Sequence, residues 1–200
     1  FPEALRIALV TLPFTFEGVN RLENARYGLT RILDVADLTI TNLNDILLSK
    51  IGSIPVNFAF KFMDSLLVST LRAIIELVTR PSLISISFAD IISACREAGL
   101  GMVGHGIGLK VSEATNNAIK NKLLDADLSD AESALIYVVA PERTTLEEAS
   151  SANQIITGKY KIERTFWGLR LERGLQYPKI MFMATGVRSP TIASLTGKSL

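Results

Sequence analysis

The sequence predicts an α/β to α+β fold: the end of a parallel sheet, a long central helix, and a four-stranded mixed sheet packed with helices. Three observations predict it. Residues 4–43 read as strand, helix and strand, which is the order of a βαβ unit. Residues 55–79 carry apolar side chains at helical spacing without a break. After residue 88, helical and strand segments alternate again in a second half.

The composition bounds the class of protein. The chain has 200 residues, of which 48% are hydrophobic and 20% charged, as in a globular protein with a sizeable core. The net charge of +1, without a basic stripe, gives no reason to expect a nucleic-acid partner. No run of about eighteen apolar residues occurs, so we expect no direct membrane insertion. The opening residues "FPEALRIALV" read as a strand, so we do not expect them to be a signal peptide, and the one cysteine fits a reducing cytoplasm, where we expect the protein.

The first forty residues support the βαβ reading. The segment "ALRIALVTLPF" (residues 4–14) is rich in β-formers and is closed by Pro13. The segment "ADLTITN" (residues 36–42) reads as a second strand. Between them, apolar residues recur at helical spacing: Leu22, Ala25, Leu29, Ile32 and Leu33. A strand, a helix and a strand in this order predict two parallel strands.

A central helix is predicted from Pro55 to Thr79, and Pro81 ends it. One face carries Phe60, Met63, Leu67, Leu71, Ile74 and Val78. Because further apolar residues widen this face, we expect the helix to be buried between layers rather than to lie on a surface. Residues 79–87 then form the boundary between two halves.

The second half begins with a predicted helix at 88–98 and a strand at 99–109. It ends with two β segments, "RTFWGLRL" and "KIMFMATGV", which we expect to be adjacent and antiparallel. The stretch "GLGMVG" (residues 99–104) matches the dinucleotide pattern G-x-G-x-x-G. That pattern must follow a strand and open a helix, whereas here it follows a helix and enters a strand. We therefore interpret its glycines as sites of close packing.

The single histidine and the single cysteine give no metal site. Cys95 lies beside Ile91 and Ile92 at helical spacing, so we interpret it as a buried apolar residue rather than a nucleophile. His105 sits among glycines in an apolar segment, where a structural role is the better interpretation.

The stretch "PFTFEGVNR" holds a candidate binding pair. Glu17 and Arg21 stand four residues apart at the start of a helix that follows a strand end, the place where open α/β sheets bind ligands. A carboxylate can accept from ribose hydroxyls, and a guanidinium can meet a phosphate. The same spacing also suits an ordinary surface ion pair, and the residues alone leave both readings open.

Taken in order, "ALRIALVTLPFTFEG", "NDILL", the long helix, "TRPSLISISFADI" and "MATGV" resemble FtsZ, the tubulin-like cell-division GTPases, over residues 4–188. The resemblance implies a nucleotide-binding domain remnant at 1–54, the central helix at 55–79, an FtsZ-like C-terminal domain at 80–188 and a flexible tail at 189–200. It also implies a GTP-dependent filament subunit of cell division, which contacts itself or another FtsZ-like subunit along the filament.

The family cradles GTP phosphates with a glycine-rich loop, and no such run occurs in these residues. We therefore expect Phe1 to begin in mid-domain and the chain alone to be inactive. GTP or GDP is the cofactor that the resemblance implies, with Mg²⁺ bound alongside the nucleotide. Glu17, Arg21 and Asn44 match positions that touch the ribose and the base, and Phe60 matches the aromatic residue that stacks on guanine. Where the family usually has aspartate, this chain has Ser65, with Asp64 beside it, so selectivity for guanine is an open point.

The loop "RPSLISISFAD" departs from the family at two positions. The family carries Asn, Asp and Asp at the positions of Ser85, Ser87 and Asp90, and its carboxylates polarise the water that attacks the γ-phosphate held by the next subunit. A serine hydroxyl is a far weaker base than a carboxylate. We therefore expect a degenerate catalytic loop, in which only Asp90 remains, and weak or no stimulation of GTP hydrolysis. The alternatives are a fragment of an active FtsZ-type GTPase, in which Asp90 suffices for turnover, and a small-molecule-binding or regulatory α+β module that does not polymerise.

Overall fold

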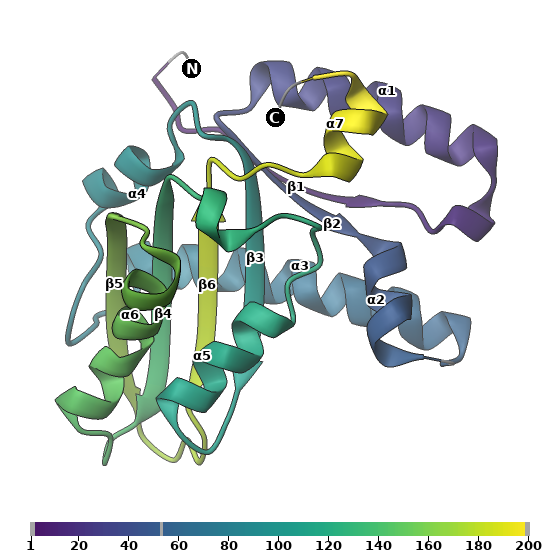
Figure 1. The fold of residues 1–200 in the computed structure, drawn as a ribbon. Coiled ribbons are helices and arrows are strands. Elements are labelled where there is room, and N and C mark those ends of the chain that lie inside the picture. The colour runs from purple at the N-terminus through teal and green to yellow at the C-terminus, as the bar shows by residue number, and fades with distance from the viewer. Residues whose placement is uncertain (1–2, 53, 199–200) are drawn as a thin grey trace.

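A computed structural model describes residues 3–52 and 54–198. Its six strands form one sheet in the order β1-β2-β3-β6-β4-β5, with helices on both faces (Figure 1). The strands are β1 (Ile7–Leu12), β2 (Leu38–Leu43), β3 (Gly99–Ile107), β4 (Ser133–Pro141), β5 (Arg164–Glu172) and β6 (Lys179–Thr185).

Two groups of helices cover the sheet. The α-helices are α1 (Val19–Val35), α2 (Asn44–Ile51), α3 (Val56–Thr79), α4 (Phe88–Cys95), α5 (Val111–Lys120), α6 (Leu146–Tyr160) and α7 (Pro190–Thr196). Two short 3-10 turns are η1 (Thr15–Glu17) and η2 (Leu128–Asp130). Residues of α3 and α4 share one buried cluster with one face of the sheet, and residues of α1, α5, α6 and α7 share another with the opposite face.

The predicted βαβ unit is confirmed. The parallel pair β1 and β2 runs in register from Ile7 opposite Leu38 to Leu12 opposite Leu43, and α1 connects the two strands. A second parallel seam, only three residue pairs long, joins β2 to β3. The remaining strands form the predicted four-stranded mixed sheet, in the order β3-β6-β4-β5.

The predicted pairing of the last two strands is wrong. Strand β6 lies between β3 and β4 and is antiparallel to both, whereas β5 pairs in parallel with β4. The prediction assumed that neighbours in sequence pair in space. Burial decides otherwise, because β6 is apolar on both faces and is buried over all but its first residue, which suits a central position. The mixed burial of β5, which carries Arg164 and Arg170, suits the edge of the sheet.

The central helix is confirmed within one residue of its predicted start, but its predicted buried face is not. The structure buries Ala59, Met63, Thr70 and Leu77. Three residues assigned to the buried face, Phe60, Leu71 and Val78, are 39%, 51% and 45% exposed, so the helix is not buried between layers as expected. Since nearly every side of this helix carries apolar residues, periodicity alone could not select the side that packs on the sheet.

The expected flexible tail at 189–200 contains a helix instead. Ser189 caps α7 by accepting from the amide of Ile192 at 3.2 Å, and Pro190 occupies the first helical position. The carboxylate of Asp125 accepts from the amide of Thr191 at 3.0 Å. Ile192 is fully buried in the core, so α7 is part of the packed domain. Serine followed by proline is a helix-start signal that the composition of the tail concealed.

The glycines of residues 99–108 lie in β3 and its exit loop, not at the start of a helix. A Cβ atom on Gly104 would lie 2.1 Å from the carbonyl oxygen of Ala118, and one on Gly106 would lie 2.0 Å from that of Ala114. Such distances are impossible contacts, so these glycines are what lets α5 lie directly on β3.

Candidate functional site

The first candidate cluster forms where β1 and β2 end. Phe14 follows β1, is fully buried, and packs edge-on against Phe60 of α3, with their ring centroids 5.3 Å apart. The ring of Phe16 stacks nearly parallel to that of Phe14, with 5.0 Å between their centroids. These aromatic contacts tie the loop after β1 to the first turns of α3. Two rings of the cluster remain exposed, Phe16 at 60% and Phe60 at 39%, and the ring of Phe60 can receive a planar ligand.

The start of α2 is joined to the same cluster. The carboxylate of Asp45 accepts from the amide of Thr15 at 3.1 Å and also from its hydroxyl. Next to it, Asn44 is only 5% exposed, and its amide oxygen Oδ1 has no hydrogen-bond partner among the described residues. A buried acceptor without a partner is costly unless a donor reaches it, so Asn44 fits a ligand that brings an N–H or O–H group.

Glu17 and Arg21 lie at this edge as well and form an ion pair of 3.1 Å. The Glu17 side chain is 12% exposed, and its second carboxylate oxygen accepts from the amide of Phe14 at 2.9 Å. One oxygen of Glu17 is therefore engaged by the backbone of the loop that follows β1. Arg21 is 72% exposed, so the contact leaves its guanidinium accessible to an anion.

On α3, Asp64 is exposed one helical turn beyond Phe60. Ser65 is turned toward its own helix, since its hydroxyl donates to the carbonyl of Phe62 at 2.7 Å. Residues four apart share a helix face, so Asp64 is better placed than Ser65 to reach a ligand on Phe60. The structure therefore gathers Glu17, Arg21, Asn44 and Phe60 at one edge, with Asp64 beside them. We call the surface formed by these five residues the strand-end edge. Phe14 and Asp45, which hold this edge together, were missed because both contacts are non-local.

The second candidate cluster is the loop between α3 and α4. Ser87 is the N-cap of α4, and its hydroxyl accepts from the amide of Asp90 at 3.1 Å. In return, the carboxylate of Asp90 accepts from the Ser87 hydroxyl at 2.7 Å and from its amide at 2.9 Å. These hydrogen bonds hold the pKa of Asp90 below its usual range. Ser85 is exposed and donates to the carbonyl of Ser82 at 3.3 Å.

The two clusters lie at opposite ends of α3 (Figure 1). Phe60 is near its first turn, whereas Ser85, Ser87 and Asp90 follow its last turn, roughly 30 Å away at 1.5 Å per residue. Within one copy of the chain they cannot act on the same small ligand. They can do so only if the loop of one copy meets the strand-end edge of another.

A cavity of about 750 Å³ lies between α3 and strands β3, β6, β4 and β5. In its wall, His105 of β3 pairs through Nε2 with the hydroxyl of Thr70 at 2.8 Å. Burial lowers the pKa of His105 to about 4, so the imidazole is neutral at pH 7. Cys95 is fully buried, and burial together with the negative charge of Asp37 raises the pKa of its thiol to about 12, which suits an apolar residue and not a nucleophile.

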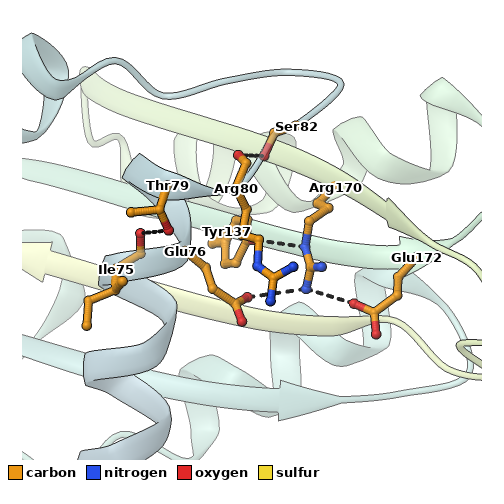
Figure 2. A network of polar contacts seen from close by, with 8 residues as sticks. All are labelled: Ile75, Glu76, Thr79, Arg80, Ser82, Tyr137, Arg170 and Glu172. Atoms are coloured by element: carbon orange, nitrogen blue, oxygen red, sulfur yellow. Dashed lines mark hydrogen bonds and ion pairs between the residues drawn. The ribbon is translucent and has the colours of Figure 1, made fainter.

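A polar network also lines this cavity (Figure 2). Arg170 of β5 donates to the carboxylate of Glu76 on α3 at 3.2 Å and to that of Glu172 at 2.7 Å. Its Nε donates to the hydroxyl of Tyr137 on β4 at 2.9 Å. Sequence reasoning missed this network, because its partners are up to 94 positions apart and no local pattern marks them.

Metal-ligating clusters and membrane-spanning helices would mark two other classes of site. Across residues 3–52 and 54–198, no group of three or more His, Cys, Asp or Glu side chains could hold a metal ion. Within the same residues, no helix is long and apolar enough to cross a membrane.

Known proteins match the chain over both halves. The family model for the FtsZ family, C-terminal domain, matches residues 98–188. Cell division protein FtsZ 1 of Thermococcus kodakarensis is 37% identical over 192 residues, which cover 94% of this chain and 51% of the relative. Cell division protein FtsZ of Haloferax mediterranei is 38% identical over 200 residues, covering 98% of this chain and 53% of that protein.

Solved structures agree. An empty FtsZ dimer from M. jannaschii superposes with a TM-score of 0.85 at 33% identity, over 92% of this chain and 55% of that chain. CetZ1 from Haloferax volcanii, solved as a GDP-bound monomer, gives a TM-score of 0.79 at 17% identity over 96% of this chain and 58% of that chain, which shows a shared fold. The chain spans about half the length of the curated relatives it matches. With the family model, the relatives and the fold in agreement, the chain belongs to the FtsZ family.

Proposed function

We propose that this chain works in a GTP-dependent, FtsZ-like cytoskeletal filament of cell division, with weak or no stimulation of GTP hydrolysis. The observation that carries the proposal is the placement of the two clusters at opposite ends of α3. In a head-to-tail filament, that placement brings the 80–90 loop of one subunit to the strand-end edge of the next. Head-to-tail contacts are heterologous and extend into open filaments when they do not close.

The strand-end edge supports a bound guanine nucleotide. Phe60 offers an exposed ring for stacking on the base, Asn44 offers a buried acceptor for a donor group, and Arg21 offers an accessible cation. Asp64 is the carboxylate on α3 that lies nearest to Phe60 along the helix, and it can accept from a guanine N–H. When bound, GTP supplies the phosphoanhydride bond that water cleaves. We propose that Mg²⁺ binds alongside the nucleotide, at its phosphate oxygens.

The loop supports weak hydrolysis. Asp90 is ionised, but its carboxylate is occupied by the amide and hydroxyl of Ser87. The serine hydroxyls at 85 and 87 cannot take a proton from water at neutral pH. We infer that the loop forms the filament contact and contributes little to the chemical step.

The partner we propose is a second copy of this protein or another FtsZ-like subunit, and the location we propose is the cytoplasm. An FtsZ dimer of M. jannaschii and a GTPγS-bound CetZ2 protofilament of Haloferax volcanii are among the solved structures that share the fold. The latter is 18% identical to this chain and supports the fold only.

The test is nucleotide-dependent sedimentation of the complete protein. We expect polymer to pellet with GTP and not with GDP. Phe60→Ala should raise the GTP concentration needed for half-maximal pelleting. Phe58→Ala is the matched control, since Phe58 lies on the same helix and is 60% exposed but has no aromatic contact with Phe14. Equal pelleting in GTP, GDP and nucleotide-free buffer would contradict the proposal.

A further inference from the structure

Strand β5 holds the segment from the end of α3 to the middle of α4 at three successive points. Before the loop, Arg170 binds Glu76, in the last full turn of α3. Within the loop, Ile84 forms a β-bridge with Leu169. After it, Arg164 donates to the Ser93 hydroxyl of α4 at 2.8 Å. The edge strand β5 therefore contacts residues 76–93, which include Asp90, before, within and after the loop.

The middle contact is made by backbone groups. The amide of Leu83 donates to the carbonyl of Leu169 at 2.8 Å, and the amide of Leu169 donates to the carbonyl of Ile84 at 2.9 Å. The neighbouring Gly168 permits this approach, because a Cβ atom there would lie 3.3 Å from the carbonyl oxygen of Ile84. The bridge spans a single residue pair, so it is too short to fix the loop without help on either side.

Arg170 supplies that help beside the bridge. Its side chain is 19% exposed and Glu76 is 20% exposed, so this ion pair is better shielded than a surface pair. On the sheet side the same guanidinium has two partners, Tyr137 and Glu172, and the hydrogen bond from Nε to Tyr137 alone keeps it directed toward α3 (Figure 2). Arg170 lies directly after Leu169, so a fixed Arg170 also fixes the bridging residue.

We propose that Arg170 is a positioning residue for the 80–90 loop. By binding Glu76, it sets the distance between the end of α3 and β5, and the Ile84–Leu169 bridge can then form. The loop is presented to the next subunit in the conformation seen here only while this pair is intact. The part of the inference that concerns filament contacts rests on the proposed function, whereas the part that concerns loop conformation does not.

The first test measures amide hydrogen exchange in this chain. Arg170→Met and Glu76→Gln each remove one partner of the pair. Both should speed exchange at the amides of Leu83 and Leu169 roughly tenfold, since local opening no longer breaks a charge-assisted contact. Glu172→Gln is the matched control: it removes the other carboxylate partner of Arg170 and leaves the contact with α3, so exchange there should stay within about twofold. Arg170→Lys should restore part of the protection.

The outcomes separate the possibilities. Unchanged exchange at the bridge in Arg170→Met and Glu76→Gln overturns the proposal. Exchange that rises equally in α5 and α6 also overturns it, because Arg170 would then support the fold as a whole. A local increase confined to residues 80–93 and to the bridging residue Leu169 supports it.

The second test uses the critical concentration for assembly of the complete protein. Arg170→Met and Glu76→Gln should raise it severalfold with the melting temperature little changed, and Glu172→Gln should not. A critical concentration that stays constant while the loop amides exchange faster overturns the role of Arg170 in filament contacts. If the unaltered complete protein does not assemble at all, the proposed function fails, and the exchange measurement alone decides the role of Arg170.

Discussion

Ser87 and Asp90 bind each other across the first turn of α4: the Asp90 amide donates to the Ser87 hydroxyl at 3.1 Å, and the Ser87 hydroxyl donates to the Asp90 carboxylate at 2.7 Å. Because the Ser87 amide also donates to the Asp90 carboxylate, at 2.9 Å, this reciprocal cap satisfies two backbone amides that would otherwise lack partners at the helix start. It also engages the one carboxylate of the loop. The same two residues thus stabilise α4 and limit what the loop can do chemically.

The cap predicts a local stability effect. Ser87→Ala removes the hydroxyl that accepts from Asp90 and should lower the free energy of unfolding by about 1 kcal/mol. Ser85→Ala is the matched control, because Ser85 is exposed and only donates to a nearby carbonyl. Urea unfolding followed by circular dichroism measures both. Equal midpoints for the two variants would show that the cap does not stabilise α4.

His105 predicts a pH dependence of stability. Its pKa is about 4 in the folded chain, against about 6.5 when unfolded. The unfolded state therefore binds the proton more readily between these values, and stability falls as pH drops below 6.5. Between pH 7 and pH 5 the loss from this group should be about 2 kcal/mol.

His105→Gln is the comparison for this measurement, since glutamine can still pair with Thr70 but does not titrate. Urea unfolding at pH 7, 6 and 5 should show a smaller loss for the variant than for the unaltered chain. Because the sequence has a single histidine, no other imidazole contributes in this range. Parallel pH profiles for the two proteins would contradict the burial of a neutral His105.

The contact between β3 and α5 predicts a severe substitution. Gly104→Ala places a Cβ atom 2.1 Å from the Ala118 carbonyl, so either the helix or the strand must shift. We expect a loss of about 3 kcal/mol, comparable to overpacking of a core. Gly158→Ala in α6 meets nothing within 4 Å and should be neutral or stabilising by up to about 1 kcal/mol. Thermal unfolding of the pair checks this, and a mild Gly104→Ala variant would argue against the close packing.

The strand-end edge predicts that the isolated chain binds GTP only weakly. Its 200 residues include no glycine-rich phosphate loop, so base and ribose contacts must supply all of the affinity. Isothermal titration calorimetry with GTP should show no submicromolar binding. Any weaker binding should be lost in Phe60→Ala and kept in Phe58→Ala. Submicromolar affinity for GTP would refute this view of the site.

Local patterns predicted those parts of the molecule that local contacts determine. The βαβ unit, the bounds of α3 and the interpretation of the 99–104 glycines depend on periodicity, proline and glycine placement, all of which are visible along the chain. The residues at the strand-end edge were predicted through the family resemblance, and the structure brings Glu17, Arg21 and Asn44 to that edge.

What could not be predicted depends on contacts between distant residues. Strand β6 takes a central position because it is apolar on both faces, which places it beside β4 and not beside β5. The sequence-based prediction instead assumed that strands adjacent in sequence pair with each other. The Arg170–Glu76 pair joins positions 94 apart, so no window of sequence contains both. The packed side of α3 was missed because apolar residues surround that helix.

Restoring the residues that the resemblance to FtsZ implies tests whether the 80–90 loop is degenerate. Ser87→Asp together with Ser85→Asn introduces a carboxylate and an amide at the positions where that resemblance implies them. Aspartate is as good an N-cap as serine, so α4 should remain capped. The substitution removes the hydroxyl that donates to the Asp90 carboxylate at 2.7 Å and sets a second negative charge beside it, whereas the hydrogen bond from the backbone amide of residue 87 remains.

The decisive measurement is steady-state phosphate release by the complete protein, below and above its assembly threshold, for the unaltered form and the double variant. Positioned acid–base groups contribute on the order of 10²–10⁴-fold, so we expect the double variant to release phosphate more than about tenfold faster, and only above the threshold. Ser85→Asn alone is the control and should give little gain. If both proteins assemble alike and release phosphate at the same rate, the serines do not limit catalysis and the claim of a degenerate loop is wrong.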